Sequence, residues 1–509
     1  MHAGAPHWLA ASPCPHLCTK PHKTMKHILH AISRLLMLSI LSIAPATLHA
    51  QESPLWWSPA LDCNASGEGS LRPRVAVNGN GEPVVLWGNN SPASNHVAVG
   101  NGSGFGPAIE VSTTGCMPAV ADWMGSSIAA AGNTVWVVMK ATPEESRPIY
   151  VRRSDDGGLT WGDTLRVEPF DGLVSRFPSI DVVDPNAPLV QYMQFDSGYF
   201  GARQVVSHMM GGSFMGPVQV SSPYAPGDVC DCCPNQVVAS DDHTIALYRN
   251  AGPNVRVIWG ATSTNGGMSF TSGAEIDTTG WILNACPSTG PDGYLTGDSL
   301  RYVWMSGANN GNKVYIGNAL ATDLSLGEQG FVHPGQAQNL QQNFPRIAGS
   351  GDTLGVVWQQ SFSGQSEILF SWSVSGINGL SEPDTVNVDL AGSQRTPDIA
   401  YANGSFHIVW SEVTGSKVRY RKATIPSAVS VQELEPAAGV NAWPNPVVDV
   451  LHVEPGPWQR ATITDVQGRL VANFPVRSGT IDMSTLTPGS YVCHLDGDAG
   501  THSFTFVKR

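Results

Sequence analysis

Residues 396–424 read TPDIAYANGSFHIVWSEVTGSKVRYRKAT, and this stretch shows the repeating unit that decides the fold. Pro397 begins a short run of β-type residues, Asn403 and Gly404 interrupt it, and a second run ends at Trp410. Ile, Val, Tyr, Phe and Trp are enriched in strands, and Asn-Gly between two such runs is typical of a tight hairpin turn. The stretch therefore predicts consecutive antiparallel strands.

The same unit occurs six more times toward the N-terminus. Its prolines are Pro73, Pro118, Pro178, Pro234, Pro287 and Pro345, with an average spacing of about 54 residues. The second strand of most units ends in an aromatic residue, as at Trp87 and Trp358. A repeat of this length fits one four-stranded blade of a β-propeller. Residues 51–425 are therefore predicted to form an all-β, seven-bladed propeller, with six blades as the alternative.

The last unit stops after three strands, and its missing fourth strand is found near the N-terminus. There Trp57-Ser-Pro-Ala-Leu-Asp62 matches the pattern of Phe105-Gly-Pro-Ala-Ile-Glu110, which precedes a final strand. A ring in which Pro59–Asp62 pairs with Val418–Lys422 has no free sheet edges that invite aggregation. We therefore predict that this N-terminal strand closes the propeller.

Two turns between third and fourth strands carry a sharper motif. The first contains Ser154, Asp156, Gly158, Thr160 and Trp161, and the looser second copy contains Ser263, Asn265, Gly267, Ser269 and Phe270. Asp or Asn caps such a turn, Gly supplies a positive φ and the aromatic residue anchors the hairpin. The motif resembles the Asp-box, or BNR repeat, of the sialidase superfamily. The resemblance implies a sialidase-like propeller in which these turns are structural.

The N-terminal region has the composition of a secretory signal peptide. After Met25 a basic segment precedes the apolar run 35–44, and Ala50 precedes the expected cleavage site. An apolar run of about ten residues is too short to span a membrane. Residues 25–50 are therefore predicted to be a signal peptide, and residues 1–24 an over-extended start. No later segment has the roughly 18 consecutive apolar residues of a membrane helix, so no transmembrane segment is expected in the mature chain.

A C-terminal module follows a linker at residues 426–438 that is rich in small residues and proline. Residues 439–509 contain alternating strands and Gly-containing turns, which predict a small β-sandwich. The module carries, in order, Pro444, Asn445, Pro446, Gly468, Arg469, Gly489, Tyr491, Lys508 and Arg509. These motifs resemble the type IX secretion system C-terminal sorting domain of Bacteroidetes. The resemblance implies the type IX secretion machinery as a partner, passage through the periplasm, and a secreted or cell-surface location.

The charge of the chain excludes one class of partner. The formal net charge is −13, and the 28 Lys and Arg residues are widely spread. Nucleic-acid binding needs clustered cations that neutralise phosphates. No nucleic-acid partner is therefore expected.

Arginines are expected around one mouth of the central channel. If each repeat proline begins an innermost strand, the residues next to the prolines form a ring at that mouth. With three residues of neighbouring strands, the ligand-binding candidates are Arg72, Arg74, Arg176, Tyr248, Arg249, Arg256, Arg346 and Arg395. Arginine binds carboxylate and sulfate in a bidentate manner, so a carbohydrate or anionic ligand is expected here. The alternative is that these arginines are solvated or paired with nearby acids.

Six cysteines lie in the same loops and are disulfide candidates in an exported protein. They are Cys63, Cys116, Cys230, Cys232, Cys233 and Cys286, while Cys493 is left over in the C-terminal module. We expect one bridge between Cys63 and Cys116, and another between Cys286 and either Cys232 or Cys233. The alternative is a soft-metal site formed by the last four thiolates. Because disulfides are favoured, no metal or cofactor is expected.

Two functions from different classes are compatible with the sequence. The first is a secreted or cell-surface propeller that binds a glycan or an anionic ligand without catalysis. The second is an exo-α-sialidase-like glycoside hydrolase, for which the resemblance implies an arginine triad, a tyrosine nucleophile activated by glutamate and an aspartate acid/base. Leu71-Arg72-Pro73-Arg74 lacks the motif of that family near the first blade. No catalytic residue is therefore assigned, and a Tyr-Glu pair at the arginine-lined mouth would discriminate the two functions.

Overall fold

The computed structural model describes residues 55–65, 67–222, 224–334, 340–426, 440–466, 468–497 and 500–509. Over these ranges the regular structure is β-strand, apart from the 3-10 turn Ile377–Gly379. The predicted signal peptide, the residues before it and the linker from residue 427 onward lie outside the described residues. No helix in the described ranges is long and apolar enough to cross a membrane.

Residues 71–275 form consecutive antiparallel sheets. The first contains β3 (Leu71–Val77), β4 (Pro83–Asn90), β5 (Ala93–Val99) and β6 (Ile109–Glu110). The second contains β7 (Ser127–Ala131), β8 (Thr134–Lys140), β9 (Ile149–Ser154) and β10 (Leu165–Arg166). The third contains β11 (Val174–Asp181), β12 (Leu189–Asp196), β13 (Phe200–Met210), β14 (Ser213–Phe214) and β15 (Val218–Gln219). The fourth contains β16 (Gln236–Ala239), β17 (Thr244–Arg249), β18 (Ile258–Ser263) and β19 (Ser272–Glu275).

The strands from residue 292 onward continue this pattern. β20 (Asp292–Thr296), β21 (Ser299–Ser306), β22 (Gly311–Leu320) and β23 (Leu326–Phe331) form one meander. β24 (Leu340–Ser350), β25 (Thr353–Phe362), β26 (Gln365–Ser373) and β27 (Asp384–Thr385) form the next, and a short parallel pairing of β22 with β24 joins the two. The last sheet contains β28 (Gln394–Ala402), β29 (Ser405–Glu412), β30 (Lys417–Thr424), β1 (Trp56–Trp57) and β2 (Leu61–Asp62).

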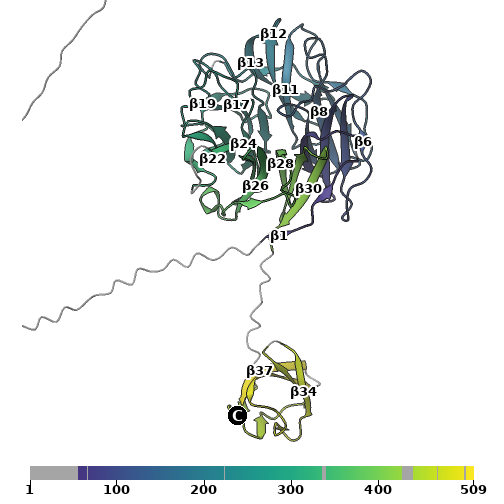
Figure 1. Cartoon of the computed structure of the whole chain (residues 1–509), viewed down its shortest axis with the longest axis vertical. Coiled ribbons are helices and arrows are strands. Elements are labelled where there is room, and N and C mark those ends of the chain that lie inside the picture. Colours follow the sequence, from purple (N-terminus) through teal and green to yellow (C-terminus); the bar gives the residue numbers. More distant parts are fainter. Residues whose placement is uncertain are drawn as a thin grey trace, which may run out of the picture. The chain divides into compact units, whose positions relative to one another are not determined.

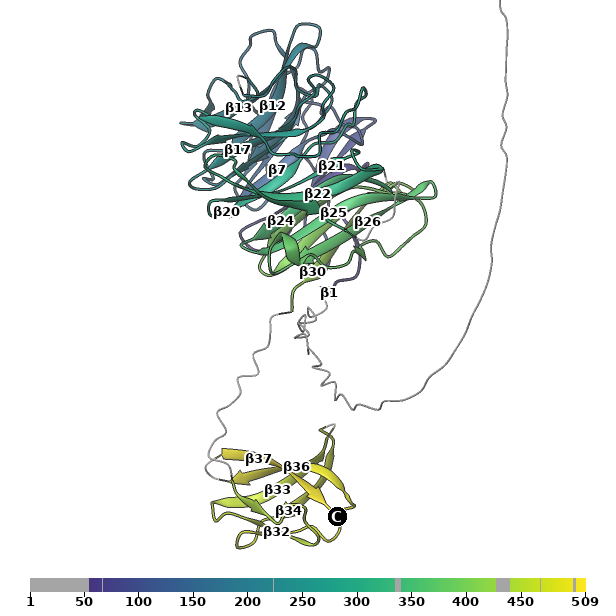
Figure 2. The ribbon, with the colours of Figure 1, turned by 90° about the vertical axis from the view of Figure 1, so that its left-hand side faces the viewer.

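The first strands of these sheets form a closed ring, which is the defining feature of a β-propeller. β3, β7, β11, β16, β20, β24 and β28 each contact the next strand in this order, and β28 contacts β3. Figures 1 and 2 show the sheets around this common centre. The prediction of an all-β propeller is confirmed.

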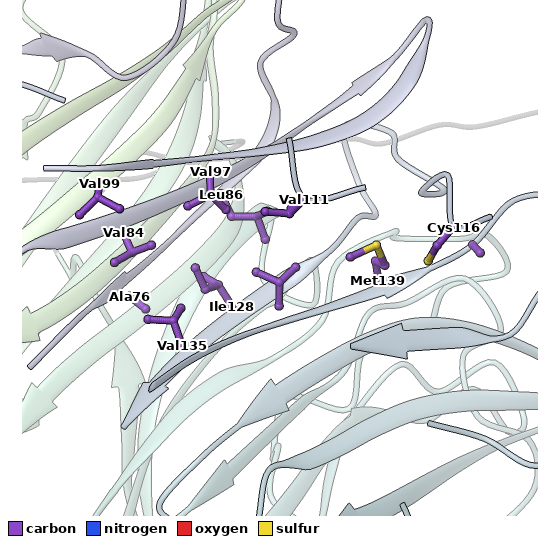
Figure 3. Packing of buried hydrophobic residues seen from close by; sticks show 12 residues of the cluster. Ala76, Val84, Leu86, Val97, Val99, Val111, Cys116, Ile128, Val135 and Met139 are labelled. Atoms are coloured by element: carbon purple, nitrogen blue, oxygen red, sulfur yellow. The ribbon is translucent and has the colours of Figure 1, made fainter. Parts of the chain in front are cut away.

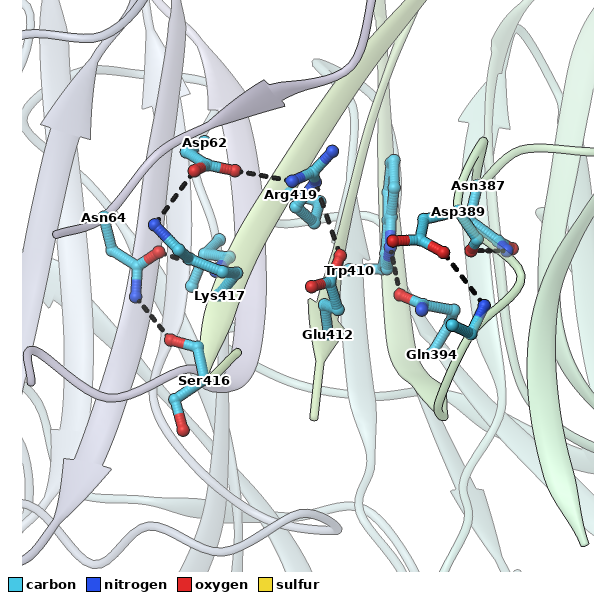
Figure 4. Close-up of polar contacts among 12 residues, drawn as sticks. Asp62, Asn64, Asn387, Asp389, Gln394, Trp410, Glu412, Ser416, Lys417 and Arg419 are labelled. Carbon is cyan, nitrogen blue, oxygen red and sulfur yellow. Dashed lines mark hydrogen bonds and ion pairs between the residues drawn. The ribbon is translucent and has the colours of Figure 1, made fainter. Parts of the chain in front are cut away.

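The N-terminal strands close the ring as the repeat predicts. Leu61 and Asp62 pair with β30, and Trp56 and Trp57 pair with its other end. The Asp62 carboxylate lies 2.9 Å from the Lys417 Nζ and 2.8 Å from the Arg419 guanidinium (Figure 4). The first and last strands of the propeller are therefore joined by backbone pairing and by ion pairs.

The repeat prolines mark a β-bulge rather than the first residue of the inner strands. In β3, β11, β24 and β28 the register shifts next to the proline, and the preceding residue has a positive φ; these residues are Arg72, Phe177, Phe344 and Thr396. Proline is tolerated there because an unpaired bulge residue needs no amide donor. In the second and fifth units the prediction is wrong, because the inner strands begin at Ser127 and Asp292 rather than at Pro118 and Pro287.

The core lies between adjacent sheets. Trp87, Trp136, Trp304, Trp358 and Trp410 are at most 1% exposed, and each comes from the second strand of its sheet. Side chains of the first and second sheets, including Leu86, Val97 and Val137, form one such layer (Figure 3). The aromatic residue of the repeat therefore fills the space between neighbouring sheets.

The two motif-bearing turns are held by their own side chains. The Asp156 carboxylate accepts hydrogen bonds from Ser154 Oγ (2.8 Å), the Thr160 amide (2.8 Å) and the Thr160 hydroxyl. Asn265 repeats this arrangement with Ser263 and Ser269. Gly158 has φ +101° and Gly267 has φ +79°. Every polar group of the motif is thus engaged within the turn, in agreement with a structural role.

The C-terminal residues form two sheets of their own. One contains β31 (Ala442–Trp443), β32 (Val450–Val453) and β35 (Thr480–Asp482). The other contains β33 (Trp458–Asp465), β34 (Leu470–Pro475), β36 (Gly489–Gly497) and β37 (Gly500–Lys508). Side chains from both sheets share one core, with Leu451, Ile463, Ile481 and Cys493 fully buried. The motif residue Tyr491 is part of this core, and its hydroxyl donates to the Thr487 carbonyl.

Candidate functional site

One side of the propeller collects two kinds of loop. Val174 at the start of β11 pairs with Phe195 at the end of β12, so the loop before β11 and the β12–β13 hairpin lie at one edge. Because the other sheets are antiparallel in the same order, their corresponding loops gather on the same side. We call this the loop side. It corresponds to the mouth of the central channel at which the repeat pattern places the loops before the inner strands.

The loop side carries a pocket of about 440 Å³ between the third and fourth sheets. Its walls are the β12–β13 hairpin, the segment before β16 and the β17–β18 loop. The side chains that line it are Tyr199, Phe200, Asp228, Asp231, Asn254 and Arg256. Phe200 is 74% exposed. The volume lies within the range of about 300–1,000 Å³ that is typical of ligand pockets. We call it the hairpin pocket.

Tyr199 links the hairpin pocket to an ionic cluster on the second sheet. Its hydroxyl donates to Glu145 Oε1 at 2.8 Å. Burial, reinforced by this hydrogen bond, raises the pKa of Tyr199 to about 12. Hydrogen bonds from its own amide and from Tyr199 lower the pKa of Glu145. The pair therefore consists of a phenol and a carboxylate at neutral pH.

Arg176 lies against the same tyrosine. Its guanidinium carbon is 5.7 Å from the Tyr199 ring centroid and 4.8 Å from that of Phe177. Its Nε forms an ion pair with Glu144 at 2.7 Å. Its charge is thus already compensated by a carboxylate.

Of the three candidates around β17, only Arg256 lines the hairpin pocket. Tyr248 and Arg249 are 0% and 1% exposed. The Arg249 guanidinium donates to the backbone carbonyls of Thr289, Arg256 and Met305. Burial lowers the pKa of Arg249 to about 10. The expectation that Tyr248 and Arg249 contact a ligand is therefore wrong, because their side chains point into the protein.

Three other candidates meet at the centre of the ring. Arg72, Arg74 and Arg346 line a cavity of about 20 Å³, enough for roughly one water molecule. Arg74 and Arg346 also line the central channel between the inner strands, which has a volume of about 370 Å³. Arg346 Nε lies 2.7 Å from Asp398, and its Nη1 lies 3.3 Å from Asp292. Both carboxylates are buried.

The pKa values of these arginines follow from burial and from their neighbours. Burial and the nearby Arg74 lower the pKa of Arg72. Burial lowers that of Arg74 to about 10. For Arg346 burial acts in the same direction, but Asp292 and Asp398 outweigh it and raise the pKa. Arg346 is therefore the cation of a buried ionic cluster.

Arg395, the last candidate, lies at the surface. It pairs with Asp122 at 3.1 Å, and the two side chains are 41% and 49% exposed. Such exposed pairs contribute about 0–1 kcal/mol. The sequence placed Arg72, Arg74 and Arg346 at one mouth, and they do line a common cavity, but it did not identify Asp292 and Asp398, which pair with Arg346.

The cysteines follow the sequence prediction in part. Cys232 is bonded to Cys286, and Cys230 to Cys233, so the adjacent cysteines reach different partners as expected. The bridge from Cys232 to Cys286 joins the loops before β16 and β20 and thus two neighbouring sheets.

The predicted bridge between Cys63 and Cys116 is wrong, since both are free thiols. Cys116 packs near Met139 in the layer between the first and second sheets (Figure 3). Cys63 belongs to a different layer, with Val75 and Tyr420. The two thiols therefore lie in different layers of the core.

The cysteine pairing has a direct consequence for thiol titration. The folded mature chain, residues 51–509, should show no reactive thiol, because burial raises the pKa of Cys116 and Cys493 to about 12 and also raises that of Cys63. Unfolding without reductant should expose three thiols, those of Cys63, Cys116 and Cys493. A count of one thiol after unfolding would show that Cys63 and Cys116 are bonded after all. The variant Cys493→Ser, as a control, should give two.

The comparisons with known proteins identify the C-terminal module. Residues 441–509 match the family described as the secretion system C-terminal sorting domain. The module is therefore a type IX sorting domain, which directs export through the periplasm to the cell surface or the medium. No curated protein matches the chain.

Solved structures resemble the chain only distantly. A protein of unknown function from Dyadobacter fermentans is 13% identical over 63% of this chain and 99% of its own, with a TM-score of 0.41. An α-L-arabinofuranosidase from Fusarium graminearum, with an iminosugar inhibitor, is 13% identical over 73% and 98%, with a TM-score of 0.39. A Trypanosoma rangeli sialidase with the inhibitor DANA is 8% identical over 88% and 87%, with a TM-score of 0.39. The fold assignment rests on the strand pairing itself.

The site and the module together define the class of protein. It is a β-propeller with a pocket on its loop side and a sorting domain for type IX secretion.

Proposed function

We propose that the protein is a secreted or cell-surface, seven-bladed β-propeller that binds a glycan in the hairpin pocket. The observation that carries this proposal is the pocket of about 440 Å³ in which exposed Phe200 adjoins Tyr199, Asp228 and Arg256. An aromatic ring packs against the C–H face of a sugar, while carboxylate and guanidinium groups hydrogen-bond its hydroxyls. Pockets that combine aromatic walls with a few polar groups are typical of specific small-ligand sites.

The charges of the pocket favour a neutral glycan over an acidic one. Asp228 and Asp231 bring two carboxylates, against the single guanidinium of Arg256. The Nε of Arg256 is already engaged by the Leu283 carbonyl at 3.0 Å. An acidic sugar would therefore lose solvation and meet two carboxylates against one guanidinium.

The arginines at the centre of the ring give less support to an anionic ligand. Arg74 and Arg346 line the central channel of about 370 Å³, but Asp292 and Asp398 line it as well and pair with Arg346. A carboxylate group of a ligand would therefore compete with two buried carboxylates.

A second candidate function, an exo-α-sialidase-like hydrolase, is favoured by one observation. Tyr199 donates to Glu145 at 2.8 Å beside Arg176, which is the pairing expected of a tyrosine nucleophile and its base. Arg176 is already paired with Glu144, however, so the arginine beside this pair is not free to bind a substrate carboxylate. The geometry therefore supports binding better than catalysis.

The propeller count and the form of the sorting domain are also proposals. Seven consecutive inner strands in the ring support seven blades, of which the last contains strands from both ends of the propeller. The common core of the two C-terminal sheets supports a small β-sandwich.

A paired experiment on the mature chain tests the function. We expect the chain to bind neutral oligosaccharides on a glycan array and to release no sialic acid from a fluorogenic sialoside. Sialoside turnover that is lost in Tyr199→Phe would instead establish the hydrolase. A chain that binds no glycan and turns over no substrate would contradict both functions.

A further inference from the structure

The four cysteines of the two disulfides form one compact sulfur cluster. The ligand atoms of Cys230, Cys232 and Cys233 all lie within 4.8 Å of one another. Cys286 is outside this group of three, but its sulfur is bonded to that of Cys232. In the part of the chain that the structure describes, this is the one group of metal-ligating side chains that converges in this way.

We propose that, when both disulfides are reduced, these four thiolates bind one thiophilic cation of the Zn²⁺ or Cu⁺ class. Soft thiolate ligands select such ions, and a tetrahedral Zn site has metal–sulfur distances of about 2.3 Å. Tetrahedral geometry then places the sulfurs roughly 3.8 Å apart. The Sγ atoms of Cys230 and Cys232, which are not bonded to each other, are already 3.6 Å apart.

The backbone holds the cysteines in place without the disulfides. The Cys230 amide donates to the Arg249 carbonyl of β17, and Val229 forms a bridge with Asn250. Gly290, in the loop of Cys286, packs directly on the Pro234 backbone, where a Cβ atom would overlap the Pro234 carbonyl. Breaking the two S–S bonds therefore leaves four thiols on loops that are still attached to each other.

The cluster is open on one side. Cys286 is exposed and Cys232 is half-buried, whereas Cys230 and Cys233 are buried. A reductant and a cation can thus enter at Cys286. The same loop carries Asp228 and Asp231 of the hairpin pocket, so a bound cation would fix that wall of the pocket.

The chemistry balances with a dithiol or a phosphine as the reductant. Two equivalents of a dithiol reduce the two disulfides to four thiols and are themselves oxidised to two disulfides. Two equivalents of a phosphine do the same with two molecules of water and become two phosphine oxides. Binding of one Zn²⁺ by all four cysteines then releases four protons. Two equivalents of a small-molecule disulfide oxidise the four thiolates back to the two bridges, are themselves reduced to four thiols and release the cation, so occupancy depends on the thiol–disulfide ratio of the surroundings.

Cadmium binding by the reduced mature chain tests the proposal. After reduction with a phosphine and its removal under anaerobic conditions, Cd²⁺ should give thiolate-to-metal charge-transfer absorption that saturates at one equivalent. Four thiols should become protected from alkylation. We expect Cys286→Ser to weaken binding by about tenfold or more, and the matched control Cys493→Ser to change nothing. The oxidised chain should bind no Cd²⁺.

Several outcomes would overturn the proposal. They are saturation below one equivalent, equal affinity in wild type and Cys286→Ser, or four thiols that remain reactive in the presence of Cd²⁺. Circular dichroism of the reduced chain provides an independent check. Loss of the β-sheet spectrum on reduction would show that the loops depend on the disulfides, which also contradicts the proposal.

Discussion

Deletion of residues 437–509 should trap a folded propeller in the periplasm of the host. These residues include the whole segment that matches the sorting-domain family, and the propeller closes through β1, β2 and β30 without them. The ring therefore keeps its core when the module is removed. Cell fractionation and immunoblotting should show near-complete loss of surface and secreted protein, with a matching increase in the periplasm.

A full-length variant with Arg395→Ala is a suitable control for export. Arg395 lies in a half-exposed pair on the propeller, so its loss leaves both the fold and the sorting domain intact. This variant should reach the cell surface or medium like wild type. Equal surface exposure of the truncated chain, judged by protease accessibility of intact cells, would contradict the role of the module.

Arg346→Ala should lower the free energy of unfolding of the propeller by about 3–5 kcal/mol. Arg346 contacts Asp292 and Asp398, whose side chains are 6% and 5% exposed. Removal of one partner from a buried ionic cluster leaves uncompensated charges in a low-dielectric interior. Urea unfolding followed by tryptophan fluorescence measures the change, because buried tryptophans occupy the layers between the sheets.

The matched substitution Arg395→Ala should cost at most about 1 kcal/mol, since its pair with Asp122 is solvent-exposed. The comparison distinguishes a structural cation from a free ligand-binding arginine, which the sequence alone cannot do for Arg346 and Arg395. If Arg346→Ala is no more destabilising than Arg395→Ala, Arg346 is not a structural cation, and its role as a free ligand-binding residue is restored.

The fold was largely predictable because each repeat unit places the same residue types at the same positions of its strands. A proline at the inner-strand bulge and a tryptophan between the sheets occur in most units. The strand that ends at Asp62 has no partner strands near it in sequence, and this indicated that it pairs with the last sheet and closes the ring. In the second unit the prediction failed because the true inner strand, Ser127–Ala131, has one large apolar residue, Ile128, among Ser and Ala and contains no proline.

The site was predictable only in part, because side-chain direction and partners depend on three-dimensional contacts. Strand position alone does not show that Arg249 points toward backbone carbonyls inside the protein. The hairpin pocket combines loops of two sheets, and sequence reasoning missed Tyr199 and Phe200. A signal was present for Phe200, because this large apolar residue lies between Gly198 and Gly201, where a turn is expected and its ring is exposed.

The affinity of a Phe200→Ala variant for the array-selected glycan tests the central claim most directly. Phe200 is exposed in the hairpin pocket, so its loss should leave stability unchanged but remove the aromatic wall. Phe170→Ala is the matched control, because Phe170 is 90% exposed in the loop before β11, outside that pocket. Isothermal titration should show at least about tenfold weaker binding for Phe200→Ala and unchanged binding for Phe170→Ala. Equal affinities of wild type and Phe200→Ala would contradict the assignment of the hairpin pocket as the glycan site.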